Sequence, residues 1–564
     1  MLFATKFAAF TDTRDRGRSM RAKFLMSEVG IGLRRNMTMT FAVVVTVAIS
    51  LSLLGIGLLS NAQVSAMKDY WYDKIEVSVF LCGPLSETSS CSGGVVTTEQ
   101  RLQIQKDLEE LSVVDSVYYE SQSEAFTRFQ ERFKESAILG GVPVSDKSFA
   151  FNRSIGFEEK QAALRVLESG ELSGFIASPG EPFWGGREVR ALEGMFELHY
   201  GVRHALAFNS ATTALHAAVA ATGVGPGDEV IVSPYTMTAT ATAILMTGAV
   251  PVFADIEERT FGLDPDSVRA NITPYTRGIM AVNLFGHPAR LGPLRKIADE
   301  GNFFLIEDNS QAPDALYDGR PAGTIGDIGI FSFNRHKVMQ SGEGGVLITN
   351  NDDFATKGAL VRNHGEVVVE PMGISDIVNT VGLNYRMTEI EAAIAQEQFR
   401  KMPNMNSQRI NLANRLTEGL RLIDGLEPPA QESGCRHVYY MYPILFDEEK
   451  VGMPRDLFTK AIVAEGFYLR SGYLRPVYLE PVYQRKLCFG YNGFPFSANP
   501  RNAELNYSAG ICPTVERLQK DSMMVTPIMQ PPQTLADMDN FIEACKKTIH
   551  NREKLLAAWN RQTI

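Results

Sequence analysis

The sequence predicts an α/β protein made of two unlike parts, and three observations support this. Past about residue 158, short β-branched runs alternate with helical stretches, a pattern typical of a mainly parallel sheet covered by helices on both faces. The 564 residues are too many for one hydrophobic core. The whole chain has an ordinary globular composition, with 45% hydrophobic and 21% charged residues. A long apolar run near the N-terminus differs from this composition and marks a separate part.

The charge balance and the cysteines narrow the class of protein. The net charge of −10 and the pI near 5.5 argue against a nucleic-acid binder, so we expect small-molecule or protein partners. Cys82 and Cys91 lie close together and could form a small disulfide loop or stay free. Four other cysteines are far apart, have no metal-site spacing and are expected to be buried or indifferent thiols: Cys435, Cys488, Cys512 and Cys545.

Residues 36–67 predict a transmembrane helix. They contain no charge, and Phe41–Leu59 is almost wholly apolar, which matches the ~20 residues that span a bilayer. A signal peptide or a buried core helix are the alternatives. Three acids and eight basic residues precede the apolar run, so a basic segment over residues 1–35 should stay in the cytoplasm while the chain exits outward. The basic residues are Lys6, Arg14, Arg16, Arg18, Arg21, Lys23, Arg34 and Arg35.

Residues 68–145 predict a small α/β module outside the membrane. Lys74–Leu81 has the β-branched alternation of a strand, and Thr97–Leu111 reads as a helix opened by a threonine cap; a second strand and helix follow. The run that begins at Met20 (MRAKFLMSEVGIGLRRNMTMTF) and continues into this module resembles the start of the bacterial cell division protein FtsX. That family links an ATPase to cell-wall hydrolases, but its three later membrane helices are absent here, so this segment should not do so.

After a linker over residues 146–157, we expect a large domain over 158–405 and a smaller α/β domain over 406–564. The expected strands are HALAFNS (204–210), DEVIVS (228–233), VPVFADI (250–256), RGIMAVNLFG (277–286) and FFLIEDN (303–309). Helices are expected at 213–223 and 290–301 between them, and the small domain should end in one charged helix over 536–560.

A lysine that could hold a cofactor lies in FSFNRHKVMQSGEGG (residues 331–345). A strand-like run ends in Ser-Phe, Lys337 follows, and Gly-Glu-Gly-Gly begins five residues later. Glycines there let the backbone pass close to a flat ligand. A lysine amine can hold a carbonyl cofactor as a Schiff base and then move a proton. Taken alone, Lys337 would more often be an ordinary surface lysine, and the surrounding pattern is what favours a cofactor role.

Two strand ends supply the other groups that such a cofactor needs. In FFLIEDNSQA, Asp308 follows a predicted parallel strand, where α/β sheets place ligands, and it could keep a pyridine nitrogen protonated. The alternative for Asp308 is a helix N-cap. In NSATTAL (209–215) a strand runs into a helix, whose free amides can bind a phosphate dianion.

These motifs, in this order, resemble the DegT–StrS family of sugar aminotransferases over about residues 158–564. The resemblance implies a pyridoxal-phosphate (PLP) fold type I large domain, like that of aspartate aminotransferase, with a smaller C-terminal domain. It further implies that Lys337 forms the Schiff base with pyridoxal 5′-phosphate and that Ser332 contacts the phosphate. Asp308 would pair with the pyridinium nitrogen, and Gln311 would lie over the ring near its hydroxyl.

The chain departs from the family pattern at two places. The family has Ser-Gly-Thr where residues 210–212 are Ser-Ala-Thr. This change costs little if the amides of Ala211 and Thr212 bind the phosphate, but it would matter if the glycine were needed for a positive φ. The family's ring-stacking aromatic residue is Met237 here. A thioether can pack on a ring, or Tyr235 could take that place.

The remaining family-like segments concern the partner subunit and the substrates. RNHGE (362–366) and GLNYRMTEIEAA (382–393) resemble the family, and by that resemblance Asn384 reaches the phosphate of a neighbouring subunit in an obligate homodimer. The implied reaction moves an amino group from glutamate or glutamine to a keto-sugar, as its sugar nucleotide, or to a keto-cyclitol. GYLRPVYLEPVY (472–483) either shapes the acceptor pocket or is a packed loop.

Alternative functions follow from the same features. Relatives with histidine in place of the lysine are sugar dehydratases; His336 directly precedes Lys337, but the flanking spacing puts Lys337 in the cofactor position.

Another alternative is a membrane-anchored division or envelope factor with a non-catalytic C-terminal domain. An outward-going helix would place the transferase outside the cell, away from its substrates, whereas the transferase portion alone would be cytoplasmic. Three explanations of this conflict are open: an inverted membrane topology, a join of two unrelated genes in the source sequence, or a start site downstream of the membrane helix.

Overall fold

The computed structural model describes residues 96–111, 134–147 and 154–561, together with single residues 114, 116, 117, 119, 121 and 149. The chain divides into two compact units, Met1–Glu120 and Ser121–Ile564. The predicted membrane helix over 36–67, the strand at 74–81 and the pair Cys82 and Cys91 lie outside the described residues. Among the helices that are described, none is both long enough and apolar enough to cross a bilayer.

The first unit contains one described helix, α3 (Thr98–Glu109), as the sequence predicts. Thr97 caps it: the Thr97 hydroxyl accepts a hydrogen bond from the Gln100 amide at 3.2 Å, and the Gln100 side chain accepts one from the Thr97 amide at 2.9 Å. This reciprocal capping box satisfies two amides that a helix start otherwise leaves unpaired. The predicted helix and its threonine cap are confirmed.

The second unit is built around a seven-stranded sheet with the order β1-β9-β8-β5-β4-β2-β3. Strands β8, β5, β4, β2 and β3 are parallel, and β9 runs antiparallel to both of its neighbours. The strands are β1 (His204–Phe208), β2 (Glu229–Val232), β3 (Val250–Phe253), β4 (Thr276–Val282), β5 (Phe304–Asp308), β8 (Ile328–Ser332) and β9 (Gly345–Thr349). All five strands expected from the sequence are present, and the mainly parallel sheet is confirmed.

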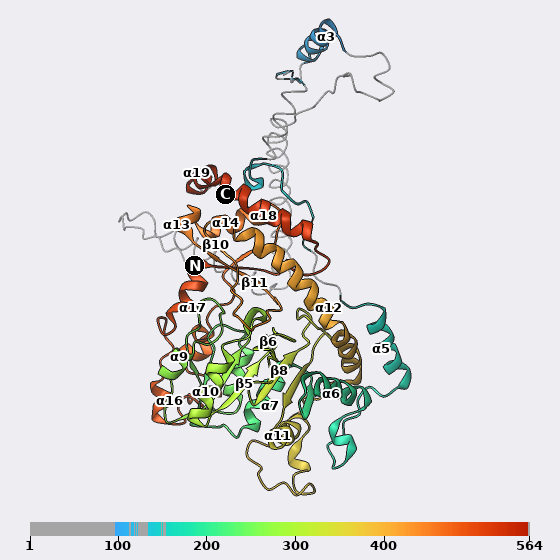
Figure 1. The fold of residues 1–564 in the computed structure, drawn as a ribbon, viewed down its shortest axis with the longest axis vertical. Coiled ribbons are helices and arrows are strands. Elements are labelled where there is room, and N and C mark those ends of the chain that lie inside the picture. Colours follow the sequence, from blue (N-terminus) through green and yellow to red (C-terminus); the bar gives the residue numbers. More distant parts are fainter. Residues whose placement is uncertain are drawn as a thin grey trace, which may run out of the picture. The chain divides into compact units, whose positions relative to one another are not determined.

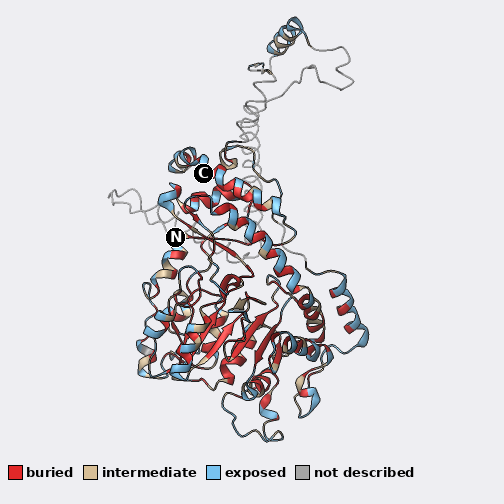
Figure 2. Ribbon diagram, in the orientation of Figure 1, coloured by how far each residue is buried: buried red, intermediate tan, exposed pale blue. Residues whose placement is uncertain are grey.

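Helices cover this sheet, so its strands are buried along most of their length (Figure 2). Helix α7 packs on β8 and β9 and against α8 and α11, whereas α10 packs on β4 and β5. Figure 1 shows α7 and α10 beside the central strands β5 and β8. The helices are α5 (Phe157–Ser169), α6 (Arg187–Tyr200), α7 (Ala211–Ala221), α8 (Ala239–Met246), α9 (Pro265–Ala270), α10 (Leu291–Gly301) and α11 (Asp352–Arg362), with short turns η3 (Glu181–Trp184), η4 (Leu284–Gly286) and η5 (Gly365–Val367) and a hairpin of β6 (Leu316–Tyr317) and β7 (Arg320–Pro321).

The smaller domain carries a four-stranded antiparallel sheet with the order β10-β11-β13-β12. Its second core lies between this sheet and α14 and α18. The expected single C-terminal helix is two helices, α18 and α19, which meet at Asn551. The elements are β10 (Leu426–Glu427), β11 (Tyr442–Phe446), β12 (Arg470–Ser471), β13 (Met523–Thr526), α13 (Glu448–Val451), α14 (Arg455–Ala464), α18 (Leu535–His550) and α19 (Arg552–Asn560).

One long helix joins the two domains. Helix α12 (Glu389–Leu420) contains Pro403 and passes without a break through residue 405, where the sequence suggested a domain boundary. Its first turns pack against α5 and α6 of the large domain, and it also packs against α18 of the small domain, as Figure 1 shows. The helix is therefore part of both domains.

The segment between β12 and β13 leaves the small domain and lies on the large one. The Val477 amide donates to the Pro234 carbonyl at 2.8 Å, and the Tyr507 hydroxyl donates to the Pro251 carbonyl at 2.8 Å. Its short elements are η6 (Val477–Leu479), α15 (Pro481–Gln484), α16 (Pro500–Glu504), α17 (Pro513–Arg517) and η7 (Leu518–Ser522). Both domains are thus tied together by chain that follows the cofactor-binding motifs.

Residues 134–147, which include η2 (Ala137–Leu139), form an N-terminal strap on the small domain. The fully buried Glu465 carboxylate accepts hydrogen bonds from the Ala137 amide at 2.8 Å and the Val144 amide at 3.0 Å. Lys547 donates to Glu465 at 2.8 Å and to the Val142 carbonyl at 2.6 Å. Most of the strap falls within the range 68–145 that the sequence assigned to the FtsX-like module, yet its described contacts are with the small domain.

Candidate active site

The predicted cofactor residues gather at one edge of the large sheet. Asp308 is the last residue of β5, and Ser332 is the last residue of β8. Ser332 pairs with Gly345 of β9, which in turn pairs with Phe208 of β1, the strand that leads into α7. Since the parallel strands end together, the carboxylate, the hydroxyl and the start of α7 share the edge where α/β sheets bind ligands.

Asp308 is held in place by two donors. The Thr240 hydroxyl donates to Oδ2 at 2.8 Å, and the Ser310 amide donates to Oδ1 at 3.2 Å. No helix starts at this position, so the N-cap alternative is wrong. Thr240 lies in α8, three residues after Met237, and was not singled out in the sequence. A fixed and buried carboxylate is what a protonated ring nitrogen requires of its partner.

The preceding residue, Glu307, has a separate, structural task. Its carboxylate is fully buried and accepts hydrogen bonds from the amides of Gly323, Ile325 and Gly326 at 2.6–2.8 Å. Burial raises the pKa of Glu307, whereas these donors oppose that rise. The two neighbouring acids therefore have different roles. Glu307 anchors the loop over residues 323–326, whereas Asp308 is available to the cofactor site.

Lys337 lies in the loop between β8 and β9, and its amine is enclosed. The Nζ atom lies 4.8 Å from the centre of the Tyr440 ring. Burial lowers the pKa of Lys337 to about 8, and the nearby Asp308 carboxylate partly opposes this shift, so the two groups share one side of the domain. Within the described part of the chain, no hydrogen bond to Nζ is found. A pKa near 8 increases the neutral, nucleophilic fraction at pH 7 by roughly two orders of magnitude over an ordinary lysine.

Packing against α7 gives a reason for the glycines that follow Lys337. A side chain at Gly345 would place its Cβ 2.6 Å from the Ala211 amide nitrogen, and Gly344 has φ +139°. At Gly344 a Cβ would also lie 2.7 Å from Met387. These glycines let the loop that carries Lys337 lie directly on the N-terminus of α7.

The start of α7 fits a phosphate group. The Ser210 hydroxyl caps the helix by accepting from the Thr213 amide at 3.2 Å. Ala211 and Thr212 are its first two residues, and their amides have no carbonyl one turn earlier to donate to. Ala211 is not among the residues with positive φ, so the replacement of the family's glycine by alanine strains nothing. Free amides at a helix N-terminus favour a dianion.

Gln311 is buried, and both ends of its amide are bonded. The Phe285 amide donates to Oε1 at 2.9 Å, and Nε2 donates to the Tyr473 hydroxyl at 3.2 Å. Tyr473 belongs to GYLRPVYLEPVY, whose Tyr478 and Tyr483 are buried in packing. That segment is thus a packed loop for most of its length but reaches the site through Tyr473.

The two candidates for ring stacking differ in exposure. Met237 is 57% exposed, whereas Tyr235 is completely buried and donates its hydroxyl to Gln519 at 2.8 Å. Asn384 is exposed, and the next residue, Tyr385, accepts a hydrogen bond from the Asn209 amide at 2.9 Å. Asn384 therefore lies close to the strand end that leads into α7.

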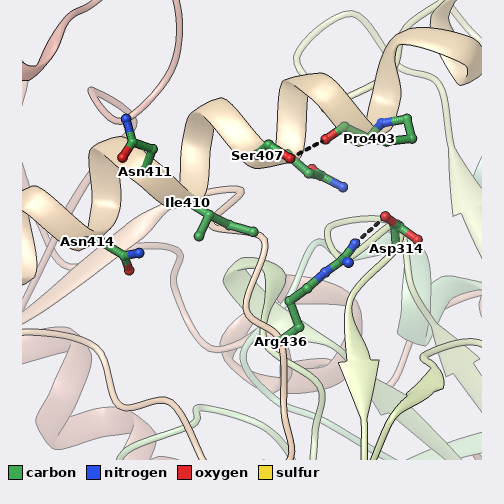
Figure 3. Close-up of a pocket in the computed structure, with 8 residues that line it drawn as sticks. Asp314, Pro403, Ser407, Ile410, Asn411, Asn414 and Arg436 are labelled. Atoms are coloured by element: carbon green, nitrogen blue, oxygen red, sulfur yellow. Dashed lines mark hydrogen bonds and ion pairs between the residues drawn. The ribbon is translucent and has the colours of Figure 1, made fainter.

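A separate cavity of about 370 Å³ lies beside α12 and includes none of the predicted cofactor residues (Figure 3). Asp314 and Arg436 form an ion pair on one wall. The helix provides all the other lining residues: Pro403, Asn406, Ser407, Ile410, Asn411 and Asn414. The Ser407 hydroxyl in this wall donates to the Pro403 carbonyl at 2.9 Å.

Two family models match the sequence. The DegT/DnrJ/EryC1/StrS aminotransferase family matches residues 176–526, which is more than half of the chain, and the FtsX extracellular domain matches residues 74–149. The second match ends beyond the strap, so it overlaps chain that packs on the small domain. Both resemblances named from the sequence are confirmed.

Individual relatives agree with the first match. The chain is 38% identical over 286 residues to the GDP-perosamine synthase of Caulobacter vibrioides, which covers 50% of this chain and 76% of that one. It is 36% identical over 338 residues to the L-glutamine:2-deoxy-scyllo-inosose aminotransferase of Streptoalloteichus tenebrarius, with 58% and 78% covered. It is 34% identical over 317 residues to the spore coat polysaccharide biosynthesis protein SpsC of Bacillus subtilis, with 55% and 79% covered.

Solved structures show the same relationship. The structure of DesI in the presence of its TDP-sugar product matches with a TM-score of 0.62 and 27% identity, covering 76% of this chain and all of that one. An aminotransferase from Psychrobacter cryohalolentis matches with a TM-score of 0.61 and 28% identity, covering 72% and 99%. Taken with the residues at the sheet edge, these matches make the chain a PLP-dependent aminotransferase, and it belongs to the DegT/DnrJ/EryC1/StrS aminotransferase family.

Proposed function

We propose that this enzyme moves an amino group from glutamate or glutamine to the keto group of a sugar nucleotide or a cyclitol. The observation that carries the proposal is the enclosed Lys337 amine, with its lowered pKa, on the same side of the domain as the fixed Asp308 carboxylate. The substrate class comes from the relatives: one is named for a GDP-sugar and another for L-glutamine and an inosose.

Each residue of the sheet edge has a task in this proposal. Bound PLP supplies an electron sink that lets the C–H bond next to the substrate nitrogen ionise. Lys337 holds the cofactor and, once released from it, carries a proton to and from carbon. Asp308, steadied by Thr240, keeps the ring nitrogen protonated. The proposed anion seat consists of the amides of Ala211 and Thr212 with the Ser332 hydroxyl, and the proposed ring contacts are Met237 and Gln311.

Spectroscopy of the two half-reactions tests the function. Purified protein loaded with PLP should show a Schiff-base band near ~420 nm that disappears on addition of glutamate or glutamine and returns on addition of a keto-sugar nucleotide or keto-cyclitol. Lys337→Ala should not form the band. A protein that forms the band but is unchanged by every amino donor would contradict a transaminase, as would release of a deoxygenated sugar without nitrogen transfer. The dehydratase reading is disfavoured because His336 is exposed, whereas the Lys337 amine is enclosed.

We further propose a homodimer in which Asn384 completes the partner's site. Three apolar side chains lie exposed just before it, with Val381 76% exposed and Ile377 and Val378 more than half exposed. Such a cluster is unusual on a free surface and is typical of an interface. The two variants Asn384→Ala and Lys337→Ala should each be inactive alone but regain activity on mixing, because a mixed dimer has one intact site. No recovery on mixing would show that Asn384 serves its own chain.

The location of the enzyme also follows from its substrates. We propose that the transferase unit acts in the cytoplasm, where PLP and nucleotide sugars are made, apart from the membrane helix predicted over residues 36–67. The tryptic peptide Asp107–Arg128 crosses the boundary between the two compact units at Glu120. Mass spectrometry of the producing cells should find transferase peptides in the cytosol without this one. Recovery of Asp107–Arg128 with the transferase in the membrane fraction would contradict the proposal.

A further inference from the structure

Tyr473 comes from the segment between β12 and β13, yet its hydroxyl meets a residue of the cofactor edge. The Gln311 Nε2 donates to it at 3.2 Å, while Oε1 of the same amide accepts from the Phe285 amide at 2.9 Å. Because a backbone N–H can only donate, the oxygen of Gln311 must face Phe285 and the NH₂ group must face Tyr473. The tyrosine hydroxyl therefore accepts a hydrogen bond from the amide NH₂ group.

Tyr473 is itself firmly held. Its amide donates to Gln519 at 2.7 Å and to the Tyr235 hydroxyl at 3.1 Å. Its ring packs edge-on against Phe285 and Tyr235, with ring centres 4.8 and 5.7 Å apart. Burial raises the pKa of Tyr473 to about 12, so the hydroxyl keeps its proton at neutral pH. Since it accepts from Gln311 and no acceptor for its own proton is found in the described residues, Tyr473 has a donor to spare.

The Tyr473 hydroxyl and the Lys337 amine lie on the same side of the domain. The Asp308 carboxylate acts electrostatically on both Tyr473 and Lys337, so both side chains are close to this one group. Gln311 follows Asp308 by three residues in the chain. A cofactor ring held by Lys337 and Asp308 would have Gln311 as a neighbour, and Tyr473 fixes the Gln311 amide through the hydrogen bond between them.

We propose that Tyr473 is a positioning residue that acts through Gln311 to set the proton affinity of the Schiff base at Lys337. This rests on the proposed function. Donors next to the conjugated ring stabilise the more negative, deprotonated form of the Schiff base, and so lower its pKa. The pKa of the Schiff base would thus depend on a residue of the segment between β12 and β13, in addition to the residues of the sheet edge.

A pH titration of the visible absorbance of the full-length, PLP-loaded protein tests this. Tyr473→Phe should raise the apparent pKa of the Schiff base by about half a unit or more, because Gln311 loses the hydroxyl that fixes its amide. Tyr491→Phe is the matched control: it lies in the same segment, is 97% exposed and should titrate as the wild type does. Equal melting temperatures of the cofactor-free forms would show that the folds are intact.

The second variant asks whether Gln311 transmits the effect. Gln311→Met should shift the pKa in the same direction, and adding Tyr473→Phe to it should change little more. A Tyr473→Phe protein that titrates like the wild type would overturn the inference and leave the proposed function standing. A full extra shift in the Gln311→Met background would overturn transmission through Gln311. A wild-type band that does not titrate would overturn the inference alone, whereas a wild-type protein that forms no Schiff-base band would remove both the inference and the proposed function.

Discussion

Two lysines of the second unit, Lys337 and Lys547, are held in opposite ways. Lys547 donates to Glu465 and to the Val142 carbonyl at 2.8 and 2.6 Å, and it joins the N-terminal strap to the small domain. Lys337 lies over the Tyr440 ring, and its pKa is lowered by burial to about 8. Lys547 is surrounded by acceptors, whereas Lys337 is enclosed without one among the described residues.

The difference separates a structural ammonium from a reactive amine. A buried cation is stable only when acceptors and a counter-charge replace its water, which is the situation of Lys547. Enclosing an amine without such acceptors destabilises its charged form and favours the neutral nucleophile. The Asp308 carboxylate is near enough to moderate this effect at Lys337 but is itself engaged by Thr240. Loss of each lysine should therefore harm a different property of the protein.

The largest expected effect is on catalysis. Lys337→Ala should lower kcat for amino transfer at least about a thousand-fold, because both the cofactor linkage and the proton carrier are removed. Lys547→Met should retain near-wild-type kcat at a temperature where it is folded. Steady-state assays of both variants decide between these roles. Equal losses of kcat in the two folded variants would contradict the distinction between a reactive Lys337 and a structural Lys547.

The next effect is on stability. Lys547→Met should lower the free energy of unfolding by about 3–5 kcal/mol, since it leaves Glu465 buried without its counter-ion. Lys554→Met is a matched control in the same contact, because Lys554 pairs with Glu135 of the strap at 3.3 Å but is exposed. It should cost less than about 1 kcal/mol. Urea unfolding followed by tryptophan fluorescence measures both values, and similar losses would show that burial does not distinguish the two pairs.

Substitution of the reactive Lys337 should change the free energy of unfolding by a smaller amount and in the opposite direction. The pKa of Lys337 is lowered from 10.5 to about 8 on folding, so between these values the unfolded chain binds more protons and stability rises with pH. At pH 7 the charged, enclosed amine costs stability. Lys337→Met should therefore raise the free energy of unfolding of the cofactor-free protein by roughly 1–3 kcal/mol at pH 7. Urea titrations at pH 7 and pH 10 should show this gain shrinking as pH rises; a constant gain would contradict the shift.

The smallest expected effect is a shift in the pH midpoint for cofactor capture when Asp308 is replaced. Its carboxylate raises the pKa of Lys337 against the effect of burial, so Asp308→Asn should move the midpoint for cofactor capture below about 8. The rate at which cofactor-free protein forms the Schiff base, measured from pH 6 to 10, gives this midpoint. A midpoint that stays where it is, or moves upward, would show that the two groups do not interact.

The parts predictable from the sequence are those encoded locally. Strands β2 to β5 are buried along most of their length and therefore appear as short, mainly apolar runs. The small domain's sheet was not recognised as antiparallel, because β12 has two residues and its partner β13 begins at Met523, about fifty residues later. Helix α12 hid the domain boundary for another reason: its amphipathic pattern continues through both domains.

The same distinction holds within the site. Lys337, Asp308 and the α7 start each follow a strand end, so short motifs mark them. Thr240 and Tyr473 reach Asp308 and Gln311 from 68 and 162 residues away in sequence, which no local pattern reveals. The contact of the strap with the small domain could not be predicted for the same reason, since Glu465 lies 328 residues from Ala137.

Chemical trapping of the cofactor tests the central claim most directly. PLP-loaded protein is reduced with borohydride, digested and mapped by mass spectrometry, which shows every lysine that carried the cofactor. We expect the pyridoxyl group on Lys337 and none on Lys547. A label on a different lysine, or a loaded protein with no labelled peptide, would contradict the assignment of Lys337 as the cofactor lysine.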